Sequence, residues 1–210
     1  MPVELKDTSA LPLRPWQFLA YELRLDLEQI DLESLADPRR QLSQQGLRIS
    51  NLARERERLP GALETIYQLH LDCYLRQPPL AFQRAPIPFH LWHWGSLEAR
   101  DEALPDAYFL VLAGKRYVGL STIVLQRRMP GVLECRFTGV APEFAGRGIG
   151  QALKAAGVRY AVEHGYRELR TVVLAENVAM LRINESLGFE RYRSFVQSYP
   201  QLMSLQSLRA

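Results

Sequence analysis

Residues 140–150 read Val140-Ala141-Pro142-Glu143-Phe144-Ala145-Gly146-Arg147-Gly148-Ile149-Gly150. They follow an apolar stretch, 132–140, that has the pattern of a strand, and they open a stretch, 148–163, that has the pattern of a helix. The first N–H groups of a helix have no partner within it and carry the positive end of its dipole. Glycines allow a phosphate close to the backbone, and Arg147 adds charge. The stretch therefore predicts an anion site, with a tight, closely packed turn as the alternative.

The spacing of these glycines excludes two common phosphate loops. The pattern is Gly-x-Gly-x-Gly, whereas the dinucleotide fingerprint is Gly-x-Gly-x-x-Gly and needs a parallel β-α-β unit before it. A Walker loop requires Gly-Lys-Ser/Thr, which does not follow here.

The pattern of apolar residues around the loop predicts an α+β fold with a mixed sheet. We expect strands at 47–52, 107–113, 116–126, 132–140, 169–174 and 189–196, and helices within 63–75, 89–99, 148–163 and 180–187. The three strands before the loop form an antiparallel meander. The loop and its helix then make a β-α-β crossover between parallel strands.

Two motifs in this order resemble the GCN5-related N-acetyltransferase (GNAT) family. Arg147-Gly148-Ile149-Gly150, after Val140-Ala141-Pro142, is similar to its pyrophosphate loop, Arg/Gln-x-x-Gly-x-Gly/Ala. The segment from Asn177-Val178-Ala179-Met180 to Leu187-Gly188-Phe189 is similar to its second motif. The resemblance covers residues 46–199 and implies a GNAT-type fold, in which the central strands ending near Val140 and Ala175 splay apart.

The resemblance implies an N-acetyltransferase that uses acetyl-CoA as cosubstrate. An amine, on a small molecule or a peptide, would attack the thioester directly in a ternary complex. The backbone N–H of Val140 would make an oxyanion-type contact and so take part in catalysis. The cofactor-binding residues implied are Val140, Ala145, Gly146, Arg147, Gly148, Ile149, Gly150, Asn177 and Asn184.

Two positions depart from the family pattern. Ala145 stands where the loop normally has Arg or Gln, so one polar contact is lost. Asn184 stands where the family often has a tyrosine that acts as an acid, and an amide cannot serve as one. These departures leave an alternative open, a catalytically inactive CoA-binding module with a regulatory or binding role.

The resemblance also points to a general base and an acceptor side. Glu134 lies eleven residues before Ala145, in the register of the catalytic Glu of some members; a surface carboxylate paired with Arg136 is the alternative. Trp92, His93 and Trp94 could line the acceptor pocket, but a helix packed by aromatic residues is the simpler explanation of them.

Composition narrows the class of protein. The chain has 210 residues, 47% hydrophobic and 23% charged, with a net charge of +3. Its basic residues alternate with acidic ones, as in 54–58, which indicates a solvated helix face, and we expect no nucleic-acid partner. No apolar run approaches the length of a membrane span, and no ligand-like histidine cluster suggests a metal. Two distant cysteines, Cys73 and Cys135, without a secretion signal favour a cytoplasmic protein.

The residues before 46 form a separate question. We expect three parts: an N-terminal extension at 1–45 with one strand and a linker, the GNAT domain at 46–199, and a tail at 200–210. The strand-like stretch at 16–27 resembles the junction of tandem GNAT proteins. The family's sheet usually ends with two strands after the last helix, and only 189–196 is clear here. We therefore expect 16–27 to fill the vacant place, in its own sheet or in that of a second copy, which makes a homodimer possible.

Overall fold

We describe residues 13–14, 17–77, 86–99 and 102–198 of a computed structural model of this chain. Trp16 and the expected tail at 200–210 lie outside these residues. The strands are β1 (Gln17–Asp26), β2 (Leu47–Asn51), β3 (Ala103–Ala113), β4 (Arg116–Leu125), β5 (Val132–Val140), β6 (Glu168–Leu174) and β7 (Glu190–Ser198). The α-helices are α1 (Pro38–Ser43), α2 (Leu52–Arg58), α3 (Ala62–Leu75), α4 (Phe89–His93), α5 (Ile149–Glu163) and α6 (Val178–Ser186). Short 3₁₀ turns span Leu27–Gln29 and Pro142–Phe144, and one π-helical turn spans Trp94–Glu98.

The seven described strands form one mixed sheet in the order β2-β3-β4-β5-β6-β1-β7. Strands β3, β4 and β5 make the expected antiparallel meander, and β5 pairs with β6 in parallel. The crossover between β5 and β6 contains α5. The predicted α+β fold with a meander and a β-α-β crossover is therefore confirmed.

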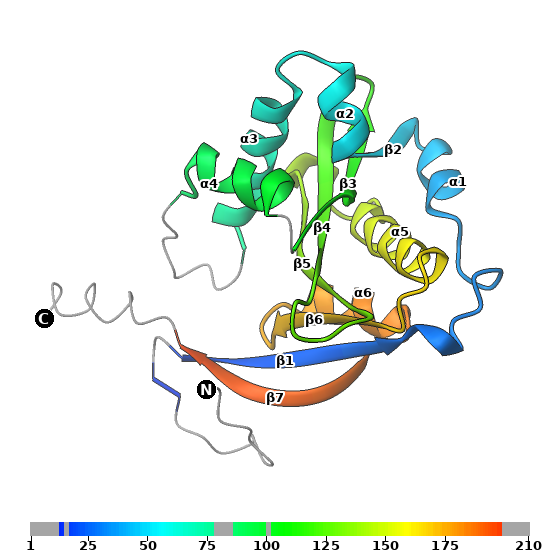
Figure 1. The fold of residues 1–210 in the computed structure, drawn as a ribbon, viewed down its shortest axis with the longest axis vertical. Coiled ribbons are helices and arrows are strands. Elements are labelled where there is room, and N and C mark those ends of the chain that lie inside the picture. The colour runs from blue at the N-terminus through cyan, green and yellow to red at the C-terminus, as the bar shows by residue number, and fades with distance from the viewer. Residues whose placement is uncertain (1–12, 15–16, 78–85, 100–101, 199–210) are drawn as a thin grey trace, which may run out of the picture.

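Strand β1 lies inside the sheet, between β6 and β7, and pairs antiparallel with both (Figure 1). It thus occupies the vacant place in its own sheet, with no second copy required. Its alternation explains the position: Leu23 and Leu25 are at most 3% exposed and join the core beneath α5, while Glu22 points to the opposite face. There the Glu22 carboxylate receives hydrogen bonds from Arg170 and Arg193.

Two layers of helices cover the two faces of the sheet. Helices α3 and α4 lie on one face, and α5 and α6 lie on the other (Figure 1). Helix α3 approaches β5 so closely that a Cβ built on Gly139 would stand 2.5 Å from the Cβ of Cys73. A glycine is therefore required at this point of β5 for α3 to pack on the sheet.

The expectation of a solvated helix at 54–58 is wrong at one position. Glu55, in α2, is 1% exposed. Its carboxylate accepts a hydrogen bond from Arg48 Nη1 at 2.9 Å and another from the Tyr117 hydroxyl at 3.0 Å. Burial opposes ionisation of Glu55, but these hydrogen bonds overcome it and hold its pKa below the ordinary value. Acidic and basic residues alternate over 54–58, but Glu55 lies on the packed face of α2 and only the other face is solvated.

Candidate functional site

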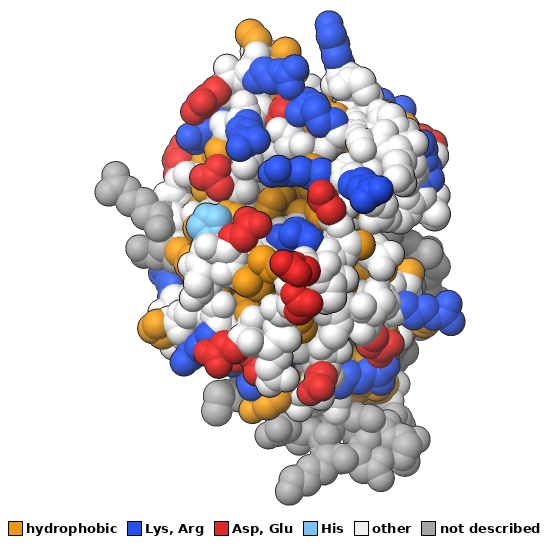
Figure 2. Space-filling view, turned by 90° about the vertical axis from the view of Figure 1, so that its right-hand side faces the viewer, with side chains coloured by type: hydrophobic (Ala, Val, Ile, Leu, Met, Phe, Trp, Pro, Cys, Tyr) orange, Lys and Arg blue, Asp and Glu red, His pale blue; other side chains and the backbone are white. Residues whose placement is uncertain are grey.

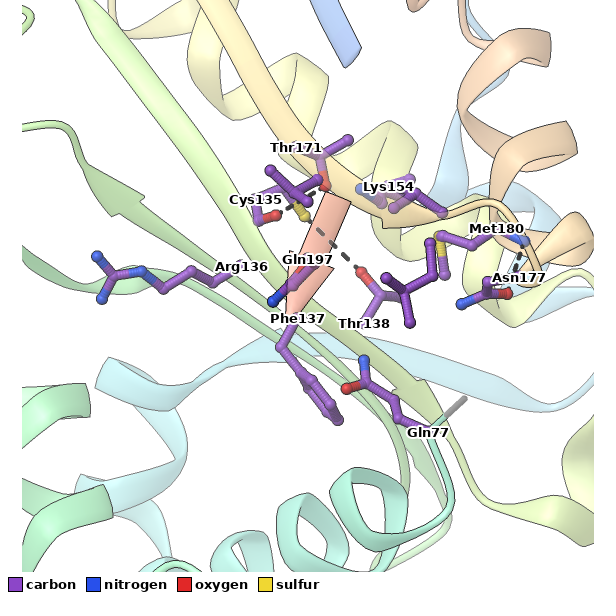
Figure 3. Close-up of a pocket in the computed structure, with 13 residues that line it drawn as sticks. Gln77, Cys135, Arg136, Phe137, Thr138, Lys154, Thr171, Asn177, Met180 and Gln197 are labelled. Atoms are coloured by element: carbon purple, nitrogen blue, oxygen red, sulfur yellow. Dashed lines mark hydrogen bonds between the residues drawn. The ribbon is translucent and has the colours of Figure 1, made fainter. Parts of the chain in front are cut away.

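The two central strands separate and leave a cleft between them. Strands β5 and β6 pair only from Val132–Glu134 to Glu168–Arg170, although both strands continue beyond this point. Directly after the last pair, the Thr171 hydroxyl donates to the Cys135 carbonyl at 2.9 Å, where a backbone ladder would otherwise continue. The expected splay is present. The side chains that line the cleft come from β5, α5, β6, α6, β7 and the turn after α3. They are drawn in Figure 3: Gln77, Cys135, Arg136, Phe137, Thr138, Lys154, Thr171, Val172, Val173, Leu174, Asn177, Met180 and Gln197.

A bulge in β5 lies where the strands part. Cys135 pairs with Ile123 and Phe137 pairs with Thr122, so Arg136 is an extra residue. Strict alternation would place Cys135 and Phe137 on the same face. The bulge instead puts Cys135 in the core beneath α5 and Phe137 in the core beneath α3. As a result, β5 presents side chains on both faces of the cleft within three residues.

The backbone N–H of Val140 points toward this cleft. The neighbouring Ala141 N–H donates to the Val118 carbonyl at 2.9 Å, toward β4. Because N–H groups alternate in direction along a strand, the Val140 N–H points away from β4, to the side where β6 has separated. The Val140 N–H is therefore directed into the cleft, and its contact with a bound cofactor stays a prediction.

The glycine loop stands at the open end of the cleft. Gly146 and Gly148 adopt φ of 75° and 73°, a region that other residues avoid. Gly148 is the N-cap of α5, and no side chain caps the helix, so its first N–H groups are available to a ligand. Ile149 differs from its loop neighbours because its side chain is buried in the core, at 1% exposure, and only its backbone can meet a ligand.

Helix α1 rests against this loop, which the sequence did not reveal. The Gln45 amide donates to the Arg147 carbonyl at 3.1 Å, and the Arg147 Nε donates back to Gln45 Oε1 at 3.3 Å. The Gln41 amide nitrogen lies 2.7 Å from the position of a Cβ on Gly148. The guanidinium of Arg147 therefore has a partner already, while Ala145 is exposed without a polar side chain.

The two asparagines of the second motif differ in their positions. Asn177 lines the cleft as the N-cap of α6, and its Oδ1 accepts the Met180 N–H at 3.2 Å (Figure 3). Asn184 is fully buried at 0% exposure and does not line the cleft. Its Nδ2 donates to the Met180 carbonyl at 2.8 Å, and its Oδ1 has no hydrogen-bond partner among the described residues.

Glu134 lies at the last paired position of β5, just before the cleft begins, and is not among the lining residues. Its carboxylate accepts a hydrogen bond from the Gln126 amide. Burial raises the pKa of Glu134, and the nearby Arg136 only partly offsets this. The alternative of a simple pair with Arg136 is not what the structure shows, because the Arg136 Nη1 donates to Glu102 at 3.0 Å.

A second hollow opens beside the cleft on the α3 and α4 face. It shares Arg136 and Phe137 with the cleft, and His70, Trp92 and Tyr108 also line it. Its surface is mostly apolar and aromatic.

The three expected acceptor-side residues separate in this region. Trp92 is 4% exposed and packs against Tyr67 and Phe89 while it faces the hollow. His93 instead lies 3.1 Å from Glu98, and Trp94 is 55% exposed. Only Trp92 lines the hollow.

Two candidate functional residues, His70 and Lys154, were not predicted from the sequence. His70 lines the second hollow, stacks on Phe137 with ring centroids 4.7 Å apart, and has its Nδ1 3.1 Å from the Tyr108 hydroxyl. Burial lowers its pKa to about 4, so the ring is neutral at pH 7. Lys154 lines the cleft from α5. A polar residue within the apolar face of each predicted helix was the available signal for both.

Other classes of site receive little support from the described part of the chain. No helix there is long and apolar enough to cross a membrane, and no group of three metal-ligating side chains comes together. Figure 2 shows the face formed by α1 and α5, where acidic and basic side chains are interspersed and form no continuous basic patch.

Sequence comparisons match this chain to acetyltransferases. A sequence model described as the Acetyltransferase (GNAT) family matches residues 63–189. A mycothiol acetyltransferase from Kocuria rhizophila is 43% identical over 63 residues, which cover 30% of this chain and 21% of that protein. A mycothiol acetyltransferase from Amycolatopsis mediterranei is 33% identical over 98 residues, 44% of this chain and 33% of that protein. The chain thus spans only a third or less of the length of these two relatives.

Solved structures share the fold at low identity. A GCN5-related N-acetyltransferase from Sphaerobacter thermophilus has a TM-score of 0.61 and 22% identity, and the match covers 87% of this chain and 51% of that one. A tandem GNAT protein from the clavulanic acid biosynthesis pathway has a TM-score of 0.56 and 17% identity, with 86% and 53% covered.

Proposed function

This chain belongs to the GNAT family of acetyltransferases, and from that premise we propose that it transfers the acetyl group of acetyl-CoA to the amine of a small molecule by direct attack in a ternary complex. The observation that carries the proposal is the separation of β5 from β6 after three paired residues, with an uncapped helix N-terminus at the open end. Such a cleft admits an extended arm between two strands and an anion at its mouth.

The residues around the cleft fit the cofactor. The N–H groups from Gly146 to Gly150 would hold the pyrophosphate, and a side chain on Gly148 would collide with Gln41 and displace this loop. The Val140 N–H and the Asn177 amide would bind the arm. Acetyl-CoA, when bound, supplies the acyl thioester; the protein orients it and excludes water.

The second hollow is our candidate for the acceptor side. It adjoins the cleft through Arg136 and Phe137, and its aromatic lining suits an acceptor with an apolar portion. We propose Glu134 as the base, because burial raises its pKa above the ordinary value and so makes its carboxylate a stronger proton acceptor. Its place just before the cleft requires that the proton reach it through water.

Calorimetry with acetyl-CoA and CoA tests the first half of the proposal. We expect binding by the wild type and none by Gly148→Val, because the new side chain would collide with Gln41, strain a backbone of positive φ and so distort the loop that would hold the phosphates. Gly114→Val is the matched control: Gly114 also has a positive φ, 59°, but stands in open space in the turn after β3. Normal acetyl-CoA binding by Gly148→Val would show that the loop is a turn and not a phosphate site.

Release of CoA thiol with a panel of amines tests the second half. The panel includes the deacetylated form of mycothiol, since the relatives are named mycothiol acetyltransferases, together with amino acids, polyamines and peptides. Thiol release with any amine supports the enzyme.

The alternative function is a CoA-binding module without catalysis. It is favoured by the burial of Asn184, which leaves no acid at that position, and by Ala145 in the loop. Binding of acetyl-CoA with no turnover on any amine would support it, while absence of binding at millimolar concentration would contradict both functions.

A further inference from the structure

Lys154 is the buried cation of the cleft. It lies in the second turn of α5, where the helix is packed against the sheet, and it is only 3% exposed. It nevertheless lines the cleft, and Figure 3 shows it on the same side as Cys135 and Thr171. Within the described residues no carboxylate lies within 4.0 Å of its ammonium, and Nζ lies 5.6 Å from the centre of the Phe189 ring.

An unpaired buried ammonium is unfavourable for folding. Water is lost from the charge, and a ring at this distance replaces only part of that interaction. The neighbouring helix positions show what packing alone selects, since Leu153, Ala155 and Ala156 are all buried and apolar. A methionine would fill the same volume without a charge. The lysine is therefore better explained by an anion that enters the cleft than by the core.

The position of Lys154 along the cleft suggests which anion this is. The glycine loop stands at the open end, and the lining begins at Cys135 and Thr171, directly after the last paired residues. An arm held at the loop by its phosphates would carry its reactive end toward this closed end. The other charged lining residue, Arg136, is 47% exposed and already paired with Glu102. Lys154 is thus the cation left to meet charge at the reactive end.

We propose that Lys154 places its ammonium beside the sulfur of the bound thioester and stabilises the negative charge that develops there, an inference that rests on the proposed function. The amine lone pair forms the C–N bond, the C–S bond breaks, and its electron pair stays on sulfur as a thiolate beside the ammonium. The amine proton leaves to the base or to water. Lys154 would therefore supply what the buried amide of Asn184 cannot.

Titration of the thiol of bound CoA, followed by the ultraviolet absorbance of the thiolate, tests this contact without turnover. Opposite charge at close range shifts a pKa by about 1–3 units. We expect the thiol of CoA bound to the wild type to titrate at least about one unit below free CoA, and this shift to disappear in Lys154→Met. Lys154→Arg should retain part of it, and Lys115→Met, in the exposed turn after β3, should retain all of it.

Kinetics and thermal unfolding supply readouts that a structural lysine would not produce. Turnover of Lys154→Met should fall about tenfold or more, as one lost unit of thiol stabilisation implies. Its acetyl-CoA affinity should stay near that of the wild type, and its melting temperature should be equal or higher, because an unpaired buried charge has been removed.

The outcomes separate the two proposals. If the wild type binds no CoA, the proposed function fails. If the wild type binds CoA but the bound thiol titrates like free CoA, the inference about Lys154 fails while the function stands. This comparison needs only the wild type, so it decides the question even if Lys154→Met does not fold.

Discussion

Protonation of His70 should couple folding to pH, and His70→Asn isolates this coupling. The ring is half-buried, stacked on Phe137 and close to the Tyr108 hydroxyl, and loss of water around it lowers its pKa from 6.5 to about 4. Asparagine keeps a polar group near the Nδ1 position for Tyr108 but cannot titrate.

The sign of the effect follows from proton binding. Below the ordinary histidine pKa the unfolded chain takes up a proton that the native state refuses, so the free energy of unfolding falls with pH. One pKa unit corresponds to about 1.4 kcal/mol. As pH falls from 6.5 to about 4, the free energy of unfolding of the wild type should decrease by about 3 kcal/mol through His70 alone. Above pH 6.5 this contribution is fully retained.

Urea unfolding at several values between about pH 7.5 and about pH 4.5 measures the difference between wild type and His70→Asn. At neutral pH the variant should be less stable by about 1–3 kcal/mol, because a stacked ring is lost from a packed site. Toward acid the gap should close by about 2–3 kcal/mol. His90→Asn, on the exposed side of α4, leaves His70 in place and should follow the wild type. A gap between wild type and His70→Asn that stays constant with pH would refute the argument.

Three further predictions concern the buried carboxylate, the first strand and the base. Glu55→Gln should lower stability by about 1–3 kcal/mol at neutral pH. Because the pKa of Glu55 is held below its ordinary value, this loss should vanish as pH falls through the lowered pKa. Urea unfolding measures the stability difference between wild type and variant, and a difference that persists in acid would contradict a stabilising role for the ionised carboxylate. Deletion of residues 1–28 removes β1 and three buried leucines, each of which contributes about 1.5–3 kcal/mol to folding by its burial. The cooperative thermal transition should therefore be lost, and an unchanged melting temperature would exclude a structural role for β1. Glu134→Gln should lower turnover by about 10²–10³ and spare acetyl-CoA affinity in calorimetry, whereas wild-type turnover would assign Glu134 to structure alone.

The local elements could be predicted because their causes lie within a few residues. Glycines at 146 and 148 mark the loop, since only glycine readily adopts the positive φ needed there. Apolar alternation indicates β3 to β6, and the packed face of α5 follows from its period. The π-helical turn at Trp94–Glu98 could not be predicted, because it has no sequence pattern of its own.

The side chains of the site were harder to place for a different reason. The bulge at Arg136 reverses which face Phe137 occupies, and a bulge depends on the pairing of two strands. The burial of His70 and Lys154 likewise depends on what packs over their helices. Asn184 occupies the position at which the family often has a tyrosine, yet the turn of α6 directs its side chain into the core.

The family, the glycine loop and the order of elements can be read from short stretches of the chain, because they depend on short-range hydrogen bonding, backbone conformation and spacing. The position of β1, the burial of particular charges and the set of residues that line the cleft follow instead from how distant segments pack together. Strand β1 contacts β6 across about 150 residues of chain, as the bond from Arg170 to Glu22 shows at a separation of 148. Such contacts are selected by burial and by complementary hydrogen bonding over the whole sheet, and no local pattern specifies them.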